Sequence, residues 1–487
     1  MPGATTNHLR PLGSTGLACH PLGFGCYRIM EGNAEHEAAL RKYLDRGGNL
    51  IDTSANYGDG LSEVLVGRVL QGVLKDYPRD RVIVVTKGGY IQGQNMTLAR
   101  RREFPDVVRY GDGIWHSIHP EFLETQITMS LDRMQLDMAD VYLLHNPEYF
   151  LEDQAHHQPV GDAERDEFYR RVREAFRYLE DQVAKGRIRW YGISSNNFPA
   201  PISAPTRTSV ERCWQAAESV SPQHHFRVVQ LPLNLYESGG ALEPNNSGKT
   251  VLAFAKEKSL GVLLNRPLNA FFSNRMIRLA DYLPPGQPPP GVERLQQILD
   301  PLFQMEKDLV EQHGIPLLYG EGKGIAHYLG TIVPQVKSPA QWEQAFYEYV
   351  VMPIERWATE CQQLYGGQPE WPHWDAWWKR FAQTLPAVFE EIARYVGSSQ
   401  QAVSDEVRAQ VEGAGYPPSP GMDVSLSRMA SNVLLNLEGV SSVLVGMRRP
   451  EYVDDAMGAV ALAPVDSLAI LNRFRQMVAP ASTTTIQ

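Results

Sequence analysis

The segment Leu50-Ile51-Asp52-Thr53-Ser54-Ala55-Asn56-Tyr57-Gly58 joins a short apolar run to a polar turn. Behind it, Leu61, Leu65 and Val69 recur at helical spacing, and an almost wholly β-branched run follows at 82–86. An apolar run, an amphipathic helix and a second apolar run are typical of a strand–helix–strand unit with parallel strands. This stretch therefore predicts an α/β architecture.

The same alternation continues along the chain. We expect further strands in the apolar runs at residues 22–25, 141–144, 190–193, 228–231, 261–264 and 442–445. Together with the two runs above they make eight, and eight strands alternating with helices predict a (β/α)8 TIM barrel. Their near-continuous apolar character suits a sheet that is covered on both faces. The segment from Leu9 to Pro21, around Gly13 and Gly16, predicts an N-terminal hairpin placed to plug the barrel floor.

The alternation stops between residues 272 and 421, after the seventh predicted strand. Proline- and glycine-rich runs at 283–291 and 415–421 enclose helical segments that hold six of the nine tryptophans. We therefore expect a barrel formed by 1–271 and 422–487, and a helical insertion at 272–421 over its carboxyl face. The tryptophans fit a small helical core, an aromatic wall or lid for the substrate, or an oligomer interface, and the sequence leaves these open.

Composition limits the classes of function. The 487 residues are 43% hydrophobic and 21% charged, which excludes a mainly disordered chain. The 46 Lys and Arg against 56 Asp and Glu give a net charge of −10, which argues against a large nucleic-acid surface. With no secretory signal and no apolar run of membrane-spanning length, we expect a cytoplasmic protein without a membrane partner.

The sequence does not predict a metal site. The four cysteines lack Cys-x-x-Cys spacing, so neither a disulfide framework nor a cysteine-based zinc site is expected. His156-His157 and His224-His225 are adjacent in sequence, and no further ligand accompanies them at helical spacing.

Four chemically active residues fall at the ends of three successive predicted strands: Asp52 and Tyr57, Lys87, and His145. In an α/β barrel the carboxyl ends of the strands carry the active site. An ammonium near a phenol lowers its pKa, so Lys87, held by Asp52, would bring Tyr57 toward use as a general acid. His145 would orient a carbonyl oxygen. Taken singly, each residue also fits a helix cap, a packed aromatic, a surface cation or a core histidine.

These residues resemble the aldo-keto reductase superfamily. Asp-x-x-x-x-Tyr-Gly at 52–58 is similar to its first signature, and Lys87 and His145 fall where its lysine and histidine do. The resemblance covers roughly 8–271 and 423–478. It implies an NAD(P)-dependent oxidoreductase that transfers hydride between nicotinamide and a small carbonyl or alcohol substrate, with Tyr57 as the general acid.

The resemblance also implies a cofactor site. The segment Gly192–Phe198 looks like the one that holds the nicotinamide carboxamide, and Gln230 is similar to the family's glutamine. Two places depart from the family. Arg266 stands where an aromatic residue commonly stacks on the ring, and the run after strand eight has an unusual sequence. The expected cofactor residues are Ser194, Ser195, Asn196, Gln230, Arg266, Gly446, Arg448, Arg449 and Asp455.

The cofactor form and the direction of reaction stay open. Arg448 and Arg449 at a predicted helix start favour NADP, while NAD remains possible. Two alternatives are an NAD-dependent sugar or alcohol dehydrogenase, and a reductase-like regulatory or binding subunit that docks through the insertion. The sequence names neither the substrate nor the oligomeric state. From the sequence between Lys87 and His119 we expect another loop at the barrel rim.

Overall fold

The computed structural model describes residues 9–75, 78–273, 275–283, 288–318, 323–336, 338–369, 371–418 and 424–479. Within it the chain forms two compact units. The first comprises Met1–Leu279 and Gln410–Gln487, and the second comprises Ala280–Ala409. Each unit is described by itself below.

The first unit is built on a closed eight-stranded barrel, as the sequence predicted. The strands are β3 (Leu22–Gly25), β4 (Leu50–Asp52), β5 (Ile83–Gly88), β9 (Ala139–His145), β10 (Ile188–Ser194), β11 (Phe226–Pro232), β12 (Gly261–Asn265) and β15 (Ser442–Val445). Each pairs in parallel with its neighbour, and β15 closes the barrel on β3. Since all eight strands run the same way, their carboxyl ends meet at one mouth.

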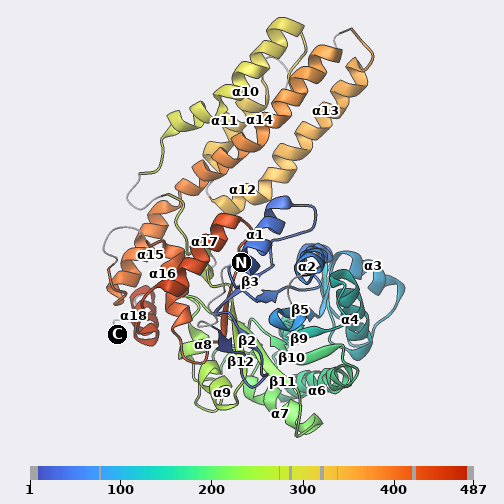
Figure 1. Cartoon of the computed structure of the whole chain (residues 1–487), viewed down its shortest axis with the longest axis vertical. Helices are drawn as coiled ribbons and strands as arrows, with labels where there is room; N and C mark the ends of the chain where they lie inside the picture. The colour runs from blue at the N-terminus through green and yellow to red at the C-terminus, as the bar shows by residue number, and fades with distance from the viewer. Residues whose placement is uncertain are drawn as a thin grey trace. The chain divides into compact units, whose positions relative to one another are not determined.

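Helices surround this barrel, and successive ones pack against each other around it (Figure 1). They are α1 (Ala34–Asp45), α2 (Leu61–Val73), α3 (Gly93–Arg101), α4 (Pro120–Met134), α5 (Tyr149–His157), α6 (Asp162–Ala184), α7 (Val210–Val220), α8 (Gly239–Leu242), α9 (Val251–Glu257), α16 (Leu426–Leu435), α17 (Pro450–Gly458) and α18 (Ser467–Val478). A further helix, α15 (Gln401–Gly413), crosses the boundary between the two units.

A hairpin of β1 (Arg10–Pro11) and β2 (Ala18–Cys19) precedes the barrel, which confirms that prediction. Its Leu12 is fully buried in one cluster with Leu50 and Ile83, the first residues of their strands. The hairpin therefore fills the amino end of the barrel. Gly13 has a φ of +55°, and a Cβ there would lie 2.2 Å from the backbone nitrogen of Gly261, so only glycine fits.

Two loops at the mouth contain regular structure. Between Lys87 and His119 the expected rim loop holds α3 and a three-stranded antiparallel sheet of β6 (Tyr90–Ile91), β8 (Ile114–His116) and β7 (Val108–Gly111). After β12 comes a hairpin of β13 (Asn269–Phe272) and β14 (Arg275–Arg278), which belongs to the barrel unit. The units thus divide at 279/280 and 409/410, whereas the sequence suggested 272 and 421, and residue 421 lies outside the described residues.

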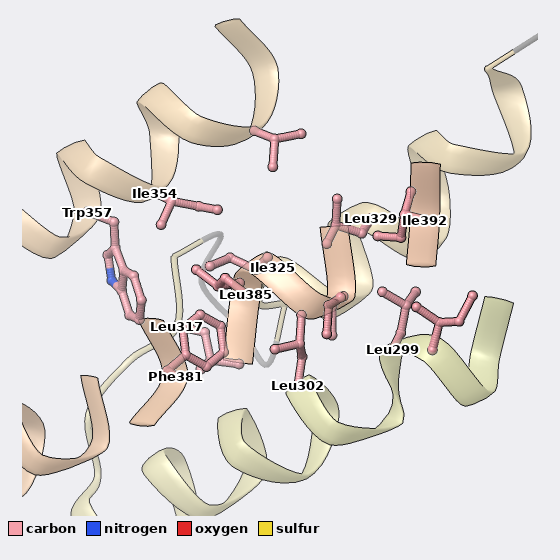
Figure 2. Packing of buried hydrophobic residues seen from close by; sticks show 14 of the residues in the cluster. Leu299, Leu302, Leu317, Ile325, Leu329, Ile354, Trp357, Phe381, Leu385 and Ile392 are labelled. Carbon is pink, nitrogen blue, oxygen red and sulfur yellow. The ribbon is translucent and has the colours of Figure 1, made fainter. Parts of the chain in front are cut away.

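The second unit is helical. Its helices are α10 (Val292–His313), α11 (Ile325–Ile332), α12 (Pro339–Phe346), α13 (Met352–Tyr365) and α14 (Trp371–Ser398), with a π-helical turn at Tyr347–Val351. Figure 2 shows Leu299, Leu302, Ile325, Trp357 and Phe381 among the side chains that pack between these helices.

Tryptophans belong to this second core. Trp342, Trp357, Trp374 and Trp377 are buried, and Trp371 and Trp378 pack against them. The indole nitrogen of Trp377 donates to the Met305 carbonyl at 2.7 Å. These contacts favour the interpretation of the tryptophans as the core of the insertion. The position of the insertion over the carboxyl face of the barrel stays a prediction.

Two general features bear on function. In the described part of the chain, no helix combines the length and apolar character needed to cross a membrane. Over the same residues, no group of three or more His, Cys, Asp or Glu side chains is arranged to hold a metal ion.

Candidate active site

Three parallel strands bring the predicted catalytic side chains together. Asp52 is the last residue of β4, Lys87 lies next to the end of β5, and His145 is the last residue of β9. Tyr57 begins a tight turn just beyond β4, in which Gly58 has a φ of +55°. All four residues therefore lie at the carboxyl mouth of the barrel.

Lys87 is the centre of this group. Its ammonium donates to Oδ2 of Asp52 at 2.7 Å, to the Thr53 carbonyl at 2.9 Å and to the phenol oxygen of Tyr57 at 3.5 Å. Lys87 and Asp52 are both buried. The other carboxylate oxygen of Asp52 accepts from the Gln230 amide at 2.8 Å. The ion pair is thus fully hydrogen-bonded, as a buried pair requires.

The pKa values differ from the expectation for Tyr57. Burial raises the pKa of Tyr57, and the neighbouring Lys87 charge, which lowers it, does not outweigh burial. For Lys87, burial lowers the pKa, but the charges of Asp52 and Tyr57 more than offset this, so the pKa is raised. The phenol is therefore protonated and the ammonium charged at neutral pH. Lys87 lowers the pKa of Tyr57 as expected, but burial raises it by more, so the net shift is upward in the protein without cofactor or substrate.

His145 faces the phenol. Its ring centroid lies 6.1 Å from that of Tyr57 and 4.7 Å from that of Tyr90, both edge to face. Nδ1 lies 3.0 Å from the hydroxyl of Ser54. Burial, together with the charges of Lys87 and His116, holds the pKa of His145 well below its ordinary value. The imidazole is therefore neutral, and a single ring nitrogen carries a proton.

A row of amide-binding groups lies beside the ion pair. Ser194 Oγ and Asn265 Nδ2 donate to Oε1 of Gln230, at 3.0 and 3.3 Å. Oδ1 of Asn265 is buried and accepts no hydrogen bond from the described residues. A primary carboxamide has one oxygen acceptor and two N–H donors. The side chains of Ser194, Gln230 and Asn265 also carry hydrogen-bond donors and acceptors, so they can bind such a group. Sequence reasoning missed Asn265, although it ends β12 opposite Pro232 of β11, next to the mouth.

The segment after β10 is held by its backbone. Ser195 N donates to the Gln230 carbonyl at 3.0 Å, and Asn196 N donates to Oε1 of Glu148 at 2.7 Å. Glu148 is a second residue that the sequence analysis missed. Burial raises the pKa of this carboxyl to about 8.

Two predicted cofactor residues have other partners. Arg266 donates to Oε1 of Glu237 at 2.6 Å, and its guanidinium lies 5.1 Å from the Phe271 ring centroid. Glu237 lies between β11 and α8, so a neighbouring loop balances the charge of Arg266. The expected contact of Arg266 with the diphosphate or substrate stays a prediction. Asp455 accepts from Ser425 Oγ at 2.7 Å and pairs with Arg428 at 3.0 Å. It joins α17 to α16, and its assignment to the cofactor site stays a prediction.

The remaining predicted residues lie between β15 and α17. Gly446 is exposed, and a Cβ added there would meet no atom within 4 Å. Arg449 is the N-cap residue of α17, and its Nε lies 3.6 Å from Glu35. Arg448 precedes it and is half-buried. A helix start with two arginines is a suitable place for a phosphate.

Fold and site together define a (β/α)8 barrel with an acid–base site at its carboxyl mouth. The model of the aldo/keto reductase family matches residues 21–298, more than half of the chain. The chain belongs to the aldo/keto reductase family, as the motifs predicted.

Individual relatives are distant. The NADH-specific methylglyoxal reductase of Escherichia coli is 30% identical over 144 residues, which are 28% of this chain and 40% of that protein. The 6-dehydroglucose reductase of Novosphingobium aromaticivorans is 28% identical over 255 residues, 50% of this chain and 67% of that protein. The chain thus matches only part of these relatives. A solved aldo-keto reductase from Bacillus halodurans in its holo form shares 16% identity, with a TM-score of 0.47, over 96% of this chain and 95% of that one.

Proposed function

We propose that this protein transfers hydride between a nicotinamide cofactor and a small carbonyl or alcohol substrate. One observation is central: the Tyr57 phenol lies within 3.5 Å of an ammonium that is itself held by a buried carboxylate. This arrangement supports proton transfer at the mouth of the barrel.

The cofactor site is proposed from the amide row. Ser194, Gln230 and Asn265 would hold a carboxamide, and the buried, unpartnered Oδ1 of Asn265 fits its N–H donor. A nicotinamide dinucleotide bound there supplies the hydride, which is the step that side chains cannot perform.

The side chains then handle the proton. Tyr57 donates its phenol proton to the substrate oxygen as that oxygen gains negative charge. The Lys87 ammonium stabilises the phenolate that remains, and Asp52 keeps the ammonium in place. Neutral His145 contacts the same oxygen and fixes its direction. A protonated Tyr57 in the resting state is the form that this role needs.

We propose NADP as the preferred cofactor, because Arg448 and Arg449 stand at the start of α17. Titration of the protein with NADPH and with NADH tests this choice. Replacing both arginines by glutamine should weaken NADPH binding by about tenfold or more and leave NADH binding within about twofold. Equal losses for both cofactors would contradict a phosphate role for these arginines.

Names of the relatives suggest the substrate class. One is a reductase of methylglyoxal and the other of 6-dehydroglucose, and both names describe small polar carbonyl compounds. We propose substrates of that kind here. The test is consumption of NADPH and NADH by the full chain with a panel of small aldehydes, ketones and oxidised sugars. Turnover with any of them supports the proposal, and binding of a cofactor without turnover would favour a regulatory or binding subunit.

A further inference from the structure

Ser54 lies between the catalytic histidine and the rim of the barrel mouth. Its hydroxyl oxygen is 3.0 Å from Nδ1 of His145, 2.7 Å from Oδ1 of Asn56 and 3.4 Å from the Lys87 carbonyl. Asn56 in turn donates to Oε1 of Gln92 at 3.3 Å. Ser54 is buried, while Asn56 and Gln92 are half-buried. A chain of hydrogen bonds therefore runs from the His145 ring toward the rim.

The number of donor protons limits the direction of each hydrogen bond between Asn56, Ser54 and His145. A hydroxyl has one proton to donate, and a neutral imidazole has one N–H. With the Asn56 amide placed so that its oxygen faces Ser54, Ser54 donates to Asn56 over the shortest of its contacts and has no proton left for His145. The 3.0 Å contact between Ser54 and His145 then requires that Nδ1–H donates to the Ser54 oxygen. Nε2, which no described residue hydrogen-bonds, is left without a proton.

We propose that Ser54, directed by Asn56, is a positioning residue that sets the tautomer of His145, with the proton on Nδ1 in the resting protein. This inference rests on the proposed function only in taking His145 as the group that contacts the substrate oxygen. Residues of the same chain thus decide whether the catalytic imidazole accepts or donates a hydrogen bond.

The tautomer bears on the direction of reaction. A bare Nε2 accepts a hydrogen bond from an alcohol O–H directly. A carbonyl oxygen has no proton and needs Nε2–H. To bind a carbonyl, the Asn56 amide must turn so that it donates to Ser54, which then donates to Nδ1. The resting network therefore suits the first binding of an alcohol, whose O–H must then turn to Tyr57 for proton transfer, and carbonyl binding includes the cost of turning the Asn56 amide.

Tautomers can be observed without substrate or cofactor. In the full chain labelled with ¹⁵N-histidine, the protonated and bare ring nitrogens of His145 give separate resonances, which are assigned by their loss in His145→Asn. We expect Nδ1–H in the wild type. Asn56→Ala removes the acceptor, so Ser54 should donate to Nδ1 and the proton should move to Nε2. Ser54→Ala removes the partner of Nδ1–H and should shift the tautomer the same way, whereas Ser54→Thr keeps a hydroxyl and should preserve Nδ1–H.

Kinetics give a second readout. Asn56→Ala should lower KM for a carbonyl substrate by about fivefold and raise KM for the corresponding alcohol, because one hydrogen bond changes direction. A loss of packing alone would weaken both substrates together. Nε2–H in the wild type, or an unchanged tautomer in both alanine variants, overturns the inference. Neither result depends on turnover, so it is separate from a failure of the proposed function, which the turnover of the wild type decides.

Discussion

At the scale of single residues, the buried pair of Lys87 and Asp52 carries the largest energetic cost. Both charges are removed from water, and each is stabilised by the other and by Gln230 or Thr53. Removing one partner leaves an unpaired buried charge. We expect Lys87→Met to destabilise the barrel by about 3–5 kcal/mol in urea unfolding.

The matched control for this prediction is the double variant Lys87→Met with Asp52→Asn, which removes both charges. It should regain a large part of the lost stability, since no charge stays buried alone. A double variant as unstable as Lys87→Met would show that the loss comes from packing and not from charge.

The buried carboxyl of Glu148 predicts how the stability of the protein depends on pH. Burial raises its pKa to about 8 in the folded chain, above the ordinary value of 4.5. A carboxyl with a raised folded-state pKa is protonated in the folded state while already ionised in the unfolded one. Stability is therefore lost as pH rises from about 4.5 and levels off above about 8.

Glu148→Gln should remove this loss. The variant should be more stable than the wild type at pH 9, by roughly 2–4 kcal/mol, and close to it at pH 5. Denaturant unfolding at both pH values measures this, with the exposed Glu103→Gln as the control. An equal difference between Glu148→Gln and wild type at both pH values would contradict the buried-acid account.

The sequence indicated some site residues and missed others for a physical reason. Asp52, Lys87, His145 and Gln230 lie in or at the ends of apolar strands, so their meeting at one mouth follows from the fold. The sequence did not show the partners of Arg266 and Asp455, because Glu237 and Ser425 lie in other loops whose approach no local pattern reveals. Asn265 and Glu148 sit in sequence stretches without a chemical signature.

At the scale of elements, the N-terminal hairpin depends on a close approach of backbones. A Cβ on Gly13 would lie 2.2 Å from Gly261 N, whereas one on Gly16 would meet nothing within 4 Å. Both glycines have positive φ, so alanine costs about 1 kcal/mol at either position from the backbone alone.

Gly13→Ala should therefore lower the free energy of unfolding by at least about 2 kcal/mol more than Gly16→Ala, because the N-terminal hairpin must also move away from β12. Thermal unfolding of the two variants measures the difference. Equal costs would mean that the hairpin adjusts freely and does not seal the barrel floor.

Elements also differ in how well they could be predicted. The eight apolar runs coincide with the barrel strands, since strands covered on both faces must be apolar along their whole length. The rim sheet of β6, β7 and β8 was expected only as a loop. Its strands have two to four residues, and short, partly exposed strands leave no periodic pattern.

At the scale of the whole molecule, each of the two units has buried hydrophobic residues of its own among the described part of the chain. Phe381 is fully buried in the second unit, among residues that all belong to that unit. Phe381→Ala should lower the free energy of unfolding of the second unit by roughly 3–5 kcal/mol and leave the barrel core intact. Calorimetry should show one of two transitions shifted, while NADPH affinity stays within about twofold. A shift of both transitions together would show that the units unfold as one.

The existence of the insertion could be predicted from the runs at 283–291 and 415–421, because proline and glycine interrupt helices and strands alike. Its boundaries could not. The β13–β14 hairpin joins the barrel unit through contacts such as Phe271 N to Oε2 of Glu237 at 3.1 Å, which composition does not reveal.

The central claim is that Tyr57 supplies the proton for a nicotinamide-dependent reaction. The most direct test measures turnover and cofactor binding together in Tyr57→Phe, which keeps the ring and its contact with His145. We predict that turnover of the best carbonyl substrate falls by about 10² to 10⁴-fold while NADPH binds as in the wild type. Turnover within a few-fold of wild type would contradict the account, because the proton would then come from another group.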